Sequence, residues 1–382
     1  MLKRIGIVFF ISLFLISCGQ QSALKKREKT ANNANKDNII IGFAYPKERV
    51  DGQSLKEGVS LAMEQVNAKG GIDGRKIQLI ERDDEDSTDQ SLLIAQDFSK
   101  DYRMHLAITH ISSHAAVPAA ATYEFSNIIM MNPSATSLRL IKPSYKNIFR
   151  IIPNNELMGS YLANYARQQG YKNIIIYYAR TEYGRDLANA FEKYAKIMGL
   201  NIVDRYSYLQ QLNSYSIALE NWKILHKFDA IFLAGTVPEA AIIVKQARYL
   251  NINVPIFGAD ALNSDALIDI AGKAAEGVVA LTTFSPNKPT PIVQQFTQEF
   301  YKKFGINPNQ ISALGYDSFK LLAYGIESTH SEDATKIATF FRQMKLWEGV
   351  DGAIVFDKTG DLKDNGNLSK VIVKDGKFQD YL

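Results

Sequence analysis

The sequence predicts an α/β protein made of two similar units, each a parallel sheet with helices on both faces. Short apolar runs alternate with segments of helical periodicity from Ile39 onward, and the same alternation restarts after Pro153. The length of 382 residues suits about two domains. Ligands of open α/β sheets bind beyond the carboxyl ends of the strands, so the two units suggest two lobes that share one cleft.

The first unit begins with a continuous apolar run at 38–44, which is typical of a strand buried on both faces. A loop is expected at 45–53. The first helix is expected to begin near Ser54, because Ser54 and Glu57 have the spacing of a capping box, and to end at Gly70 and Gly71. The remaining elements of this unit are predicted as strands at 77–80, 106–109 and 128–131 and as helices at 91–100 and 117–125.

The second unit repeats this rhythm and is followed by a mostly helical tail. Its strands are predicted at 173–178, 201–206, 230–233 and 255–257, and its helices at 158–169, 184–198, 215–226 and 238–250. The tail is predicted to form helices at 291–304, 312–328 and 333–345, then short strands at 353–356 and 370–373 with a turn at 357–360.

The N-terminus has the pattern of a secretory signal. Lys3 and Arg4 precede an apolar run at 5–16, which is too short to span a bilayer comfortably. The sole cysteine, Cys18, follows at the expected cleavage point, and residues 15–18 resemble the bacterial lipobox, in which that cysteine is lipidated. An ordinary signal with a chance cysteine and an uncleaved anchor are the alternatives. We expect a signal peptide at 1–17 and a lipidated tether at 18–37, because the latter is polar and has no apolar period.

Composition and motifs argue against several other classes of protein. The formal net charge is +4, of which Lys3 and Arg4 supply two, so nothing indicates nucleic-acid binding. One cysteine excludes an intramolecular disulfide and a cysteine-rich zinc site. The phosphate-binding, dinucleotide, nucleophile-elbow and zinc-protease motifs are absent. We therefore expect no catalytic residue, no cofactor and no metal.

Three weaker signals have structural explanations that we prefer. His110 and His114 have a spacing that could bind a metal on a helix, but they are expected at a strand end. The acidic run at 81–86 lacks the glycine and distal glutamate of a calcium loop, so a solvated loop is expected. Ser112 and Ser113 beside His114 lack an orienting acid, which disfavours a nucleophile.

Several stretches in one order resemble the branched-chain amino-acid-binding family, the type I periplasmic solute-binding proteins that feed ABC importers. They are the segment EGVSLAMEQVNAKGGIDG at 57–74, RDD at 82–84, NPSAT at 132–136, EYG at 182–184 and GYDS at 315–318. The resemblance implies two Rossmann-like lobes that close on ligand by hinge motion, joined by three crossovers near 150–153, 282–286 and 347–352. It implies a first lobe of 38–152 plus 284–348 and a second of 153–283 plus 349–382.

The resemblance also implies a ligand site. Ser113, Ser134 and Thr136 match positions that hold an amino acid's α-carboxylate, although each could be a simple N-cap. Asp260 stands where the family pairs the α-ammonium, with a turn aspartate as the alternative, and Tyr183 matches a tyrosine that covers the ligand. Ser112 and Thr236 are also expected to contact the ligand, although both depart from the family: Ser112 replaces a disulfide cysteine, and Thr236 stands where a large aromatic is frequent. Asp51 replaces an aromatic lid.

These departures leave the ligand open, with a polar or charged amino acid or a non-amino-acid amide as alternatives. The leading hypothesis is a monomeric, membrane-anchored lipoprotein that faces the periplasm or cell exterior and delivers an amino acid or related metabolite to an ABC permease. The second is a ligand-sensing or regulatory envelope lipoprotein on the same fold, since fold alone does not decide function. An extracellular hydrolase is disfavoured by the missing nucleophile motif.

Overall fold

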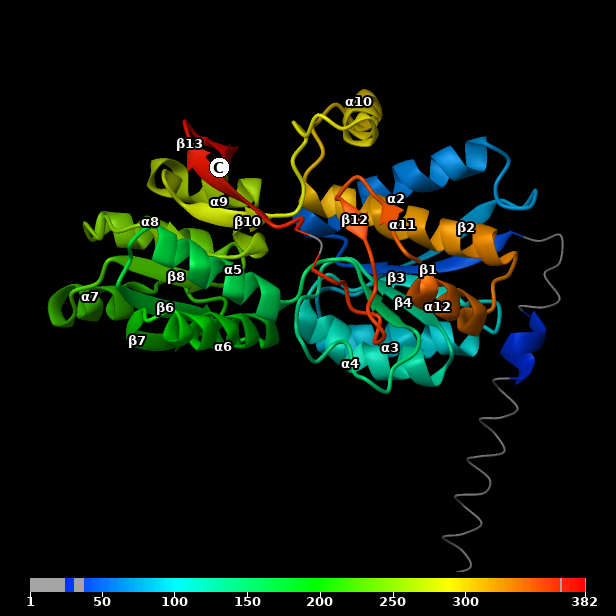
Figure 1. Cartoon of the computed structure of the whole chain (residues 1–382), viewed down its shortest axis with the longest axis horizontal. Helices are drawn as coiled ribbons and strands as arrows, with labels where there is room; N and C mark the ends of the chain where they lie inside the picture. Colours follow the sequence, from blue (N-terminus) through cyan, green and yellow to red (C-terminus); the bar gives the residue numbers. More distant parts are fainter. Residues whose placement is uncertain (1–24, 31–37, 365, 382) are drawn as a thin grey trace, which may run out of the picture.

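The computed structural model describes residues 25–30, 38–364 and 366–381. The expected signal peptide at 1–17 and Cys18 lie outside the described residues. The expectation that the tether has no regular structure is wrong for residues 25–30, which are helical. Among the described helices, none has the length and apolar character needed to cross a membrane. Figure 1 shows the two lobes side by side, with the chain passing repeatedly between them.

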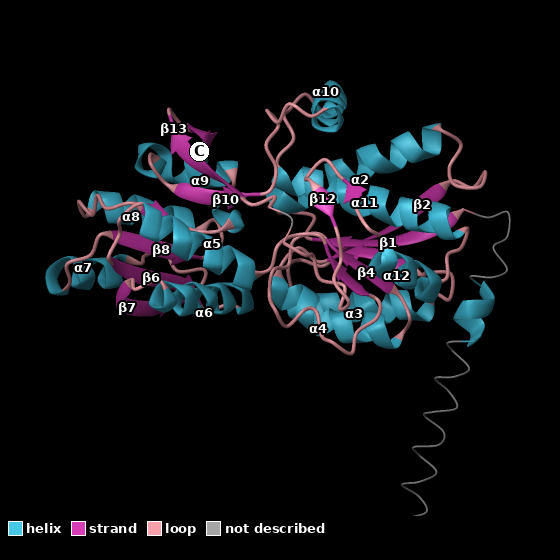
Figure 2. Ribbon diagram, viewed as in Figure 1, coloured by secondary structure: helices cyan, strands magenta, loops and turns pink. Residues whose placement is uncertain are grey.

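The first lobe is built on a parallel sheet, as the sequence predicts. Its strand order is β2-β1-β3-β4-β5, and every neighbouring pair is parallel. The strands are β1 (Ile39–Tyr45), β2 (Ile77–Asp83), β3 (Leu106–Thr109), β4 (Ile129–Asn132) and β5 (Ile148–Arg150). Helices cover both faces of the sheet (Figure 2). On one face lie α2 (Val50–Ala68), α11 (Gln310–Thr329) and α12 (Ala334–Gln343), and on the other α3 (Thr88–Lys100) and α4 (Ser113–Phe125).

The second lobe contains a larger, mixed sheet. Its order is β14-β13-β10-β9-β8-β6-β7, with the five strands from β10 to β7 parallel and the last two of the chain antiparallel. The strands are β6 (Asn173–Ala179), β7 (Asn201–Tyr208), β8 (Ala230–Ala234), β9 (Ile256–Phe257), β10 (Val279–Thr282), β13 (Ser369–Lys374) and β14 (Lys377–Tyr381). The helices are α5 (Asn155–Gln168), α6 (Glu182–Ile197), α7 (Ser216–Leu225), α8 (Glu239–Tyr249) and α9 (Asp265–Ala271), with α10 (Pro291–Phe304) leading back to the first lobe.

Several helices begin earlier than the sequence indicates, and the difference is largest for α2 and α4. Helix α2 begins at Val50 rather than near Ser54, so the capping-box interpretation of Ser54 is wrong. Ser54 is buried inside the helix, and its hydroxyl accepts a hydrogen bond from the side chain of Asn309 at 3.0 Å. Helix α4 begins at Ser113 rather than at 117, although Pro118 lies within it.

The tail also differs from the prediction. The runs at 353–356 and 370–373 do not pair with each other: β12 (Ala353–Ile354) pairs with β11 (Trp347–Glu348), and β13 pairs with β10 and β14. The expected turn at 357–360 is present, closed by a hydrogen bond from Gly360 N to Asp357 O. Strands β5, β10, β11 and β14 and helix α9 were not predicted.

The segment that follows β12 packs on the first lobe. The ring centroids of Phe356 and Phe149 are 5.0 Å apart, and Arg150 N donates to Gly360 O at 3.2 Å. Phe356 in turn forms a bridge with Leu362. We therefore propose that the third crossover follows Leu362, later than the expected 347–352, and that 353–362 belongs with the first lobe.

Two buried carboxyl groups lie beside the second crossover. The hydroxyl of Thr283 donates to Asp351 Oδ1 at 2.8 Å, and the Asp317 carboxylate accepts from the backbone N–H groups of Val350 and Asp351 at 2.9 and 2.8 Å. Burial raises the pKa of Asp351 to about 7 and holds the pKa of Asp317 well above its ordinary value. These acids connect the crossover to α11.

We predict that Asp351→Asn stabilises the protein more at pH 8 than at pH 4.5. Because the folded pKa of Asp351 is raised, the unfolded chain loses this proton first, and stability falls as the pH rises from about 4 to about 7. Asparagine cannot ionise, so the variant avoids that loss, which is on the order of a few kcal/mol. Thermal unfolding across this pH range measures the difference, with Asp375→Asn at an exposed turn as the control. A pH-independent difference between variant and parent would contradict the prediction.

Candidate ligand-binding site between the lobes

Ser112 and Ser113 lie where β3 leads into α4. Ser112 is the N-cap residue of α4, but its side chain makes no capping hydrogen bond. Ser113 is the first residue of the helix and is 2% exposed; its Oγ accepts a hydrogen bond from Ser137 N at 3.2 Å. The first N–H groups of a helix have no intrahelical acceptor and carry a partial positive charge, so this corner suits an anion.

The neighbouring loop after β4 carries Ser134 and Thr136. Ser134 Oγ donates to Ile111 O at 2.9 Å, which ties this loop to the one before α4. Thr136 is 1% exposed, and its Oγ1 has no hydrogen-bond partner among the described residues. A buried hydroxyl left without a partner costs about 1–3 kcal/mol, so a polar group that could complete it would be favoured.

In the second lobe, Tyr183 and Asp260 meet. Tyr183 lies in the first turn of α6, and Asp260 begins the 3₁₀ turn η1 (Asp260–Leu262). The Tyr183 hydroxyl donates to Asp260 Oδ1 at 3.3 Å. Burial raises the pKa of Asp260 to about 6, and burial next to Asp260 raises the pKa of Tyr183 well above its ordinary value. At neutral pH the pair is therefore a carboxylate and a neutral phenol.

Asn155, a residue that the sequence did not single out, connects the two halves. Its backbone N–H donates to Thr136 O at 2.9 Å, and its side-chain amide donates to Tyr183 O at 3.5 Å. The residue is fully buried, and its Oδ1 has no hydrogen-bond partner among the described residues. The structure thus brings Thr136, Tyr183 and Asp260 into one continuous chain of contacts across the lobes. The one sequence feature that could have pointed to Asn155 is its position just after the expected first crossover at 150–153.

A second set of contacts crosses between the lobes nearby. Ser137 Oγ donates to Asp186 Oδ2 at 2.5 Å, and Arg139 forms an ion pair with Glu182 at 3.0 Å. Both acids lie on α6, and both donors lie in the loop that follows Thr136. This loop therefore contacts the second lobe directly.

Arg150, at the end of β5, holds the same loop from beneath. It has no exposed surface, and its guanidinium binds Asp361 through two hydrogen bonds of 2.9 and 2.5 Å. Its Nη1 donates to the carbonyls of Ala135 and Ser137 at 3.3 and 2.7 Å. No sequence pattern could pair Arg150 with an aspartate that lies 211 positions away.

Thr236 is not joined to the others. It lies just after β8, and its carbonyl accepts from Ala240 N at 3.0 Å. For the part of the chain that is described, no hydrogen bond of its side chain is found. Asp51, expected near a lid position, forms an ion pair with Arg49, which also contacts Asp86.

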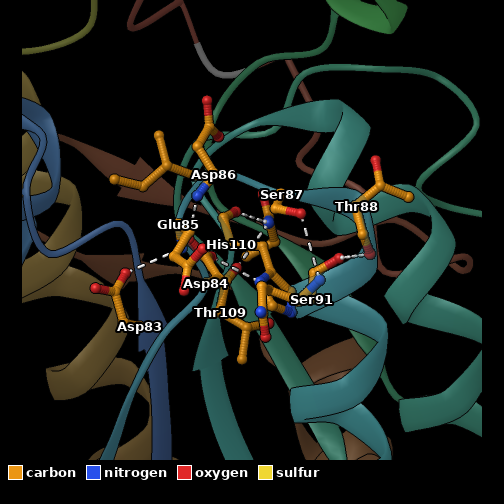
Figure 3. Close-up of polar contacts among 12 residues, drawn as sticks. Asp83, Asp84, Glu85, Asp86, Ser87, Thr88, Ser91, Thr109 and His110 are labelled. Carbon is orange, nitrogen blue, oxygen red and sulfur yellow. Dashed lines mark hydrogen bonds and ion pairs between the residues drawn. The ribbon is translucent and has the colours of Figure 1, made fainter.

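The acidic loop after β2 is less solvated than expected. Figure 3 shows Asp84 and His110 facing each other at the ends of β2 and β3, with Asp84 Oδ2 2.8 Å from His110 Nδ1 and both side chains buried. His114 instead contacts the backbone carbonyl of Asp86 at 2.7 Å. Within the described ranges, no group of three or more His, Cys, Asp or Glu side chains is arranged to bind a metal. The two histidines thus have separate structural partners.

Comparison with known proteins agrees with this architecture. The family model for periplasmic binding proteins matches residues 47–377. A Leu/Ile/Val-binding protein homolog from Brucella suis is 25% identical over 89% of this chain and 92% of its own length. The structure of an ABC transporter substrate-binding protein from Desulfitobacterium hafniense, in complex with Leu, has a TM-score of 0.80 and 32% identity, covering 90% of this chain and all of its own.

The fold is also shared with more distant proteins. The branched-chain amino acid transporter substrate-binding protein from Streptococcus pneumoniae, in complex with isoleucine, has a TM-score of 0.83 at 24% identity over 90% of this chain and 98% of its own. These relatives are substrate-binding proteins and not enzymes. The match over most of the chain, together with the two α/β lobes, shows that the chain belongs to the periplasmic binding protein family and is a solute-binding protein of the leucine-binding type.

Proposed function

We propose that the protein is an extracytoplasmic lipoprotein that captures an α-amino acid between its lobes and delivers it to an ABC permease. The observation that carries the proposal is the chain of contacts from Thr136 through Asn155 and Tyr183 to Asp260. At one end of this series of contacts, the buried hydroxyl of Thr136 has no partner among the described residues and lies near the N-terminus of α4. At the other end is the carboxylate of Asp260. An α-amino acid carries the two complementary charges a short distance apart.

The first lobe supplies the groups for the α-carboxylate. The hydroxyls of Ser113 and Thr136 and the N–H groups at the start of α4 can all donate to an anion. Ser134 acts indirectly, because its hydroxyl is already bound to Ile111 O and ties the two loops together. Ser112 caps α4 through its backbone and contributes to the same corner.

The second lobe supplies the group for the α-ammonium. Burial raises the pKa of Asp260 to about 6, and its carboxylate forms no ion pair within the described part of the chain. A bound ammonium would offset the cost of burying the Asp260 carboxylate when the lobes close, since a charge removed from water is destabilising unless it is paired. Tyr183 donates a hydrogen bond to this carboxylate, which supports a role in orienting it, and would also cover the ligand. Thr236 would line the cleft further out.

We predict that Asp260→Asn weakens amino-acid binding at least tenfold at pH 7.5, because loss of one member of a buried charge pair costs about 2–5 kcal/mol. A thermal-shift screen first identifies a ligand. It begins with leucine, which is present in the structure of the Desulfitobacterium relative, and includes polar and charged amino acids and small amides. Titration calorimetry with the best ligand measures the effect. In the parent, affinity should fall below about pH 6 as Asp260 takes up a proton, and the variant should lack this dependence.

Two controls accompany this experiment. Asp265→Asn, at an exposed neighbouring aspartate, should bind as the parent does, and Ser113→Ala should lose less affinity because backbone N–H groups remain. Without ligand, Asp260→Asn should melt at the same or a higher temperature, since ionisation of a carboxyl with a raised pKa lowers stability as the pH rises. Undiminished binding by Asp260→Asn would contradict the assignment of an ammonium at that point.

The anchoring is a separate part of the proposal. Cys18 follows a short apolar signal and is the sole cysteine of the chain, which supports its role as the lipid acceptor. Bacterial lipoproteins need more than one acyl chain for stable anchoring, since a single chain binds a membrane only marginally.

We predict that Cys18→Ala abolishes metabolic labelling with radioactive palmitate and leaves the melting temperature of the body unchanged. Ser17→Ala keeps the cysteine and a small residue before it, so that variant should still be labelled. Lipid label that persists in Cys18→Ala would rule out the lipobox assignment without affecting the ligand site.

A further inference from the structure

The helical segment 25–30 makes one buried contact with the first lobe. Arg27 is 2% exposed, whereas Lys25, Lys26, Glu28 and Lys29 around it are exposed. Figure 1 shows the segment beside the first lobe, at the end far from the second lobe. One side chain of an otherwise solvated, highly charged turn is therefore inserted into the body.

Arg27 binds the carbonyl end of α3. Its Nη2 donates to Ser99 O at 2.7 Å, and its Nη1 donates to Asp101 O at 3.1 Å and to Met104 O. The last carbonyls of a helix have no intrahelical donor and carry a partial negative charge, so a guanidinium both satisfies them and complements the helix dipole. The guanidinium carbon also lies 5.8 Å from the ring centroid of Tyr102, and the ammonium of Lys26 lies 5.6 Å from the same ring.

The surroundings are compatible with a buried cation. Burial lowers the pKa of Arg27 to about 10, so the side chain stays charged at neutral pH. The neighbouring His105 is also buried, and its pKa is lowered to about 4, by burial first and by the charge of Arg27 second. His105 is therefore neutral at physiological pH and does not repel the guanidinium. Burying an arginine is costly unless its N–H groups find acceptors, and here three backbone carbonyls accept from the guanidinium.

We propose that residues 25–30 form a docking arm, which Arg27 fastens to the end of α3 and which limits how far the body can move from the membrane. The docking itself is independent of the proposed function, while the membrane consequence rests on the proposed lipid at Cys18. A free leash from Cys18 to Asn38 would reach about 70 Å when fully extended. With Arg27 docked, the leash from Cys18 to Arg27 reaches about 30 Å. The α3 side of the first lobe then stays near the membrane.

Limited trypsin digestion of the full-length protein tests the docking. Cleavage after the exposed Lys29 should be at least tenfold faster in Arg27→Gln than in the parent, because the undocked segment adopts the extended form that proteases bind. Lys25→Gln removes the same charge from the same turn and should cleave at the parental rate. The exposed Lys302 on α10 provides an internal reference, since its cleavage reports opening of the body and should not change. Equal cleavage after Lys29 in Arg27→Gln and parent would overturn the docking.

Energy transfer tests the membrane consequence. A fluorophore on Leu93→Cys, an exposed position of α3, and an acceptor on lipid headgroups measure the approach of this helix to vesicles that carry the lipidated protein. Transfer should be higher with Arg27 present than in the same protein with Arg27→Gln. Equal transfer would overturn the proposed limit on the leash. Failure to associate with vesicles at all would instead contradict the lipid anchor, and a failed ligand screen would bear on the proposed function alone.

Discussion

The chain of contacts from Thr136 to Asp260 depends on the parallel order of the strands. In a parallel sheet all carboxyl ends lie at one edge, so the loops after β3 and β4 emerge together and their serines and threonine meet. The same rule brings the loop after β6 and the loop after β9 to one edge of the second sheet, where Tyr183 contacts Asp260. Asn155 then joins the two edges because it follows directly on the first crossover.

Several charged groups around this region are buried, and each is held differently. Arg150 and Asp361 neutralise each other, and the arginine's remaining donor holds the carbonyls of the loop that carries Thr136. The acids at 317 and 351 are bonded to backbone N–H groups or a hydroxyl, and burial raises their pKa values. Asp260 resembles them in its raised pKa but differs in its partial exposure. A partly exposed carboxyl group with a raised pKa, whose ionisation lowers the stability of the folded state, is typical of a functional position.

The sequence predicted the α/β fold and most helices, because long apolar runs and helical periodicity are local signals. Strand-to-helix loops indicated where candidate site residues lie, and their contact with a ligand stays a prediction. The sequence failed where partners are distant in the chain. Ser54 looked like a cap but is buried against Asn309. Arg150 could be recognised only from its contact with Asp361, which is distant in the sequence, and Asn155 only once the two lobes were placed together. The strands β10 and β14 were missed because one is a short run after a glycine turn and the other alternates polar and apolar residues at the sheet edge. Arg27 was assigned to a polar tether, because the composition of residues 18–37 does not indicate that the Ser99 carbonyl at the end of α3 accepts from its guanidinium.

The central claim is that one α-amino acid bridges the lobes, with its carboxylate at the start of α4 and its ammonium at Asp260. The most direct test is a crystal structure of the protein with the amino acid that gives the largest thermal shift. We expect the carboxylate within hydrogen-bond distance of the Ser113 and Thr136 hydroxyls and the ammonium within about 4 Å of the Asp260 carboxylate, the usual limit for an ion pair. A ligand bound in the reverse orientation, or bound outside the space between Thr136 and Asp260, would contradict it.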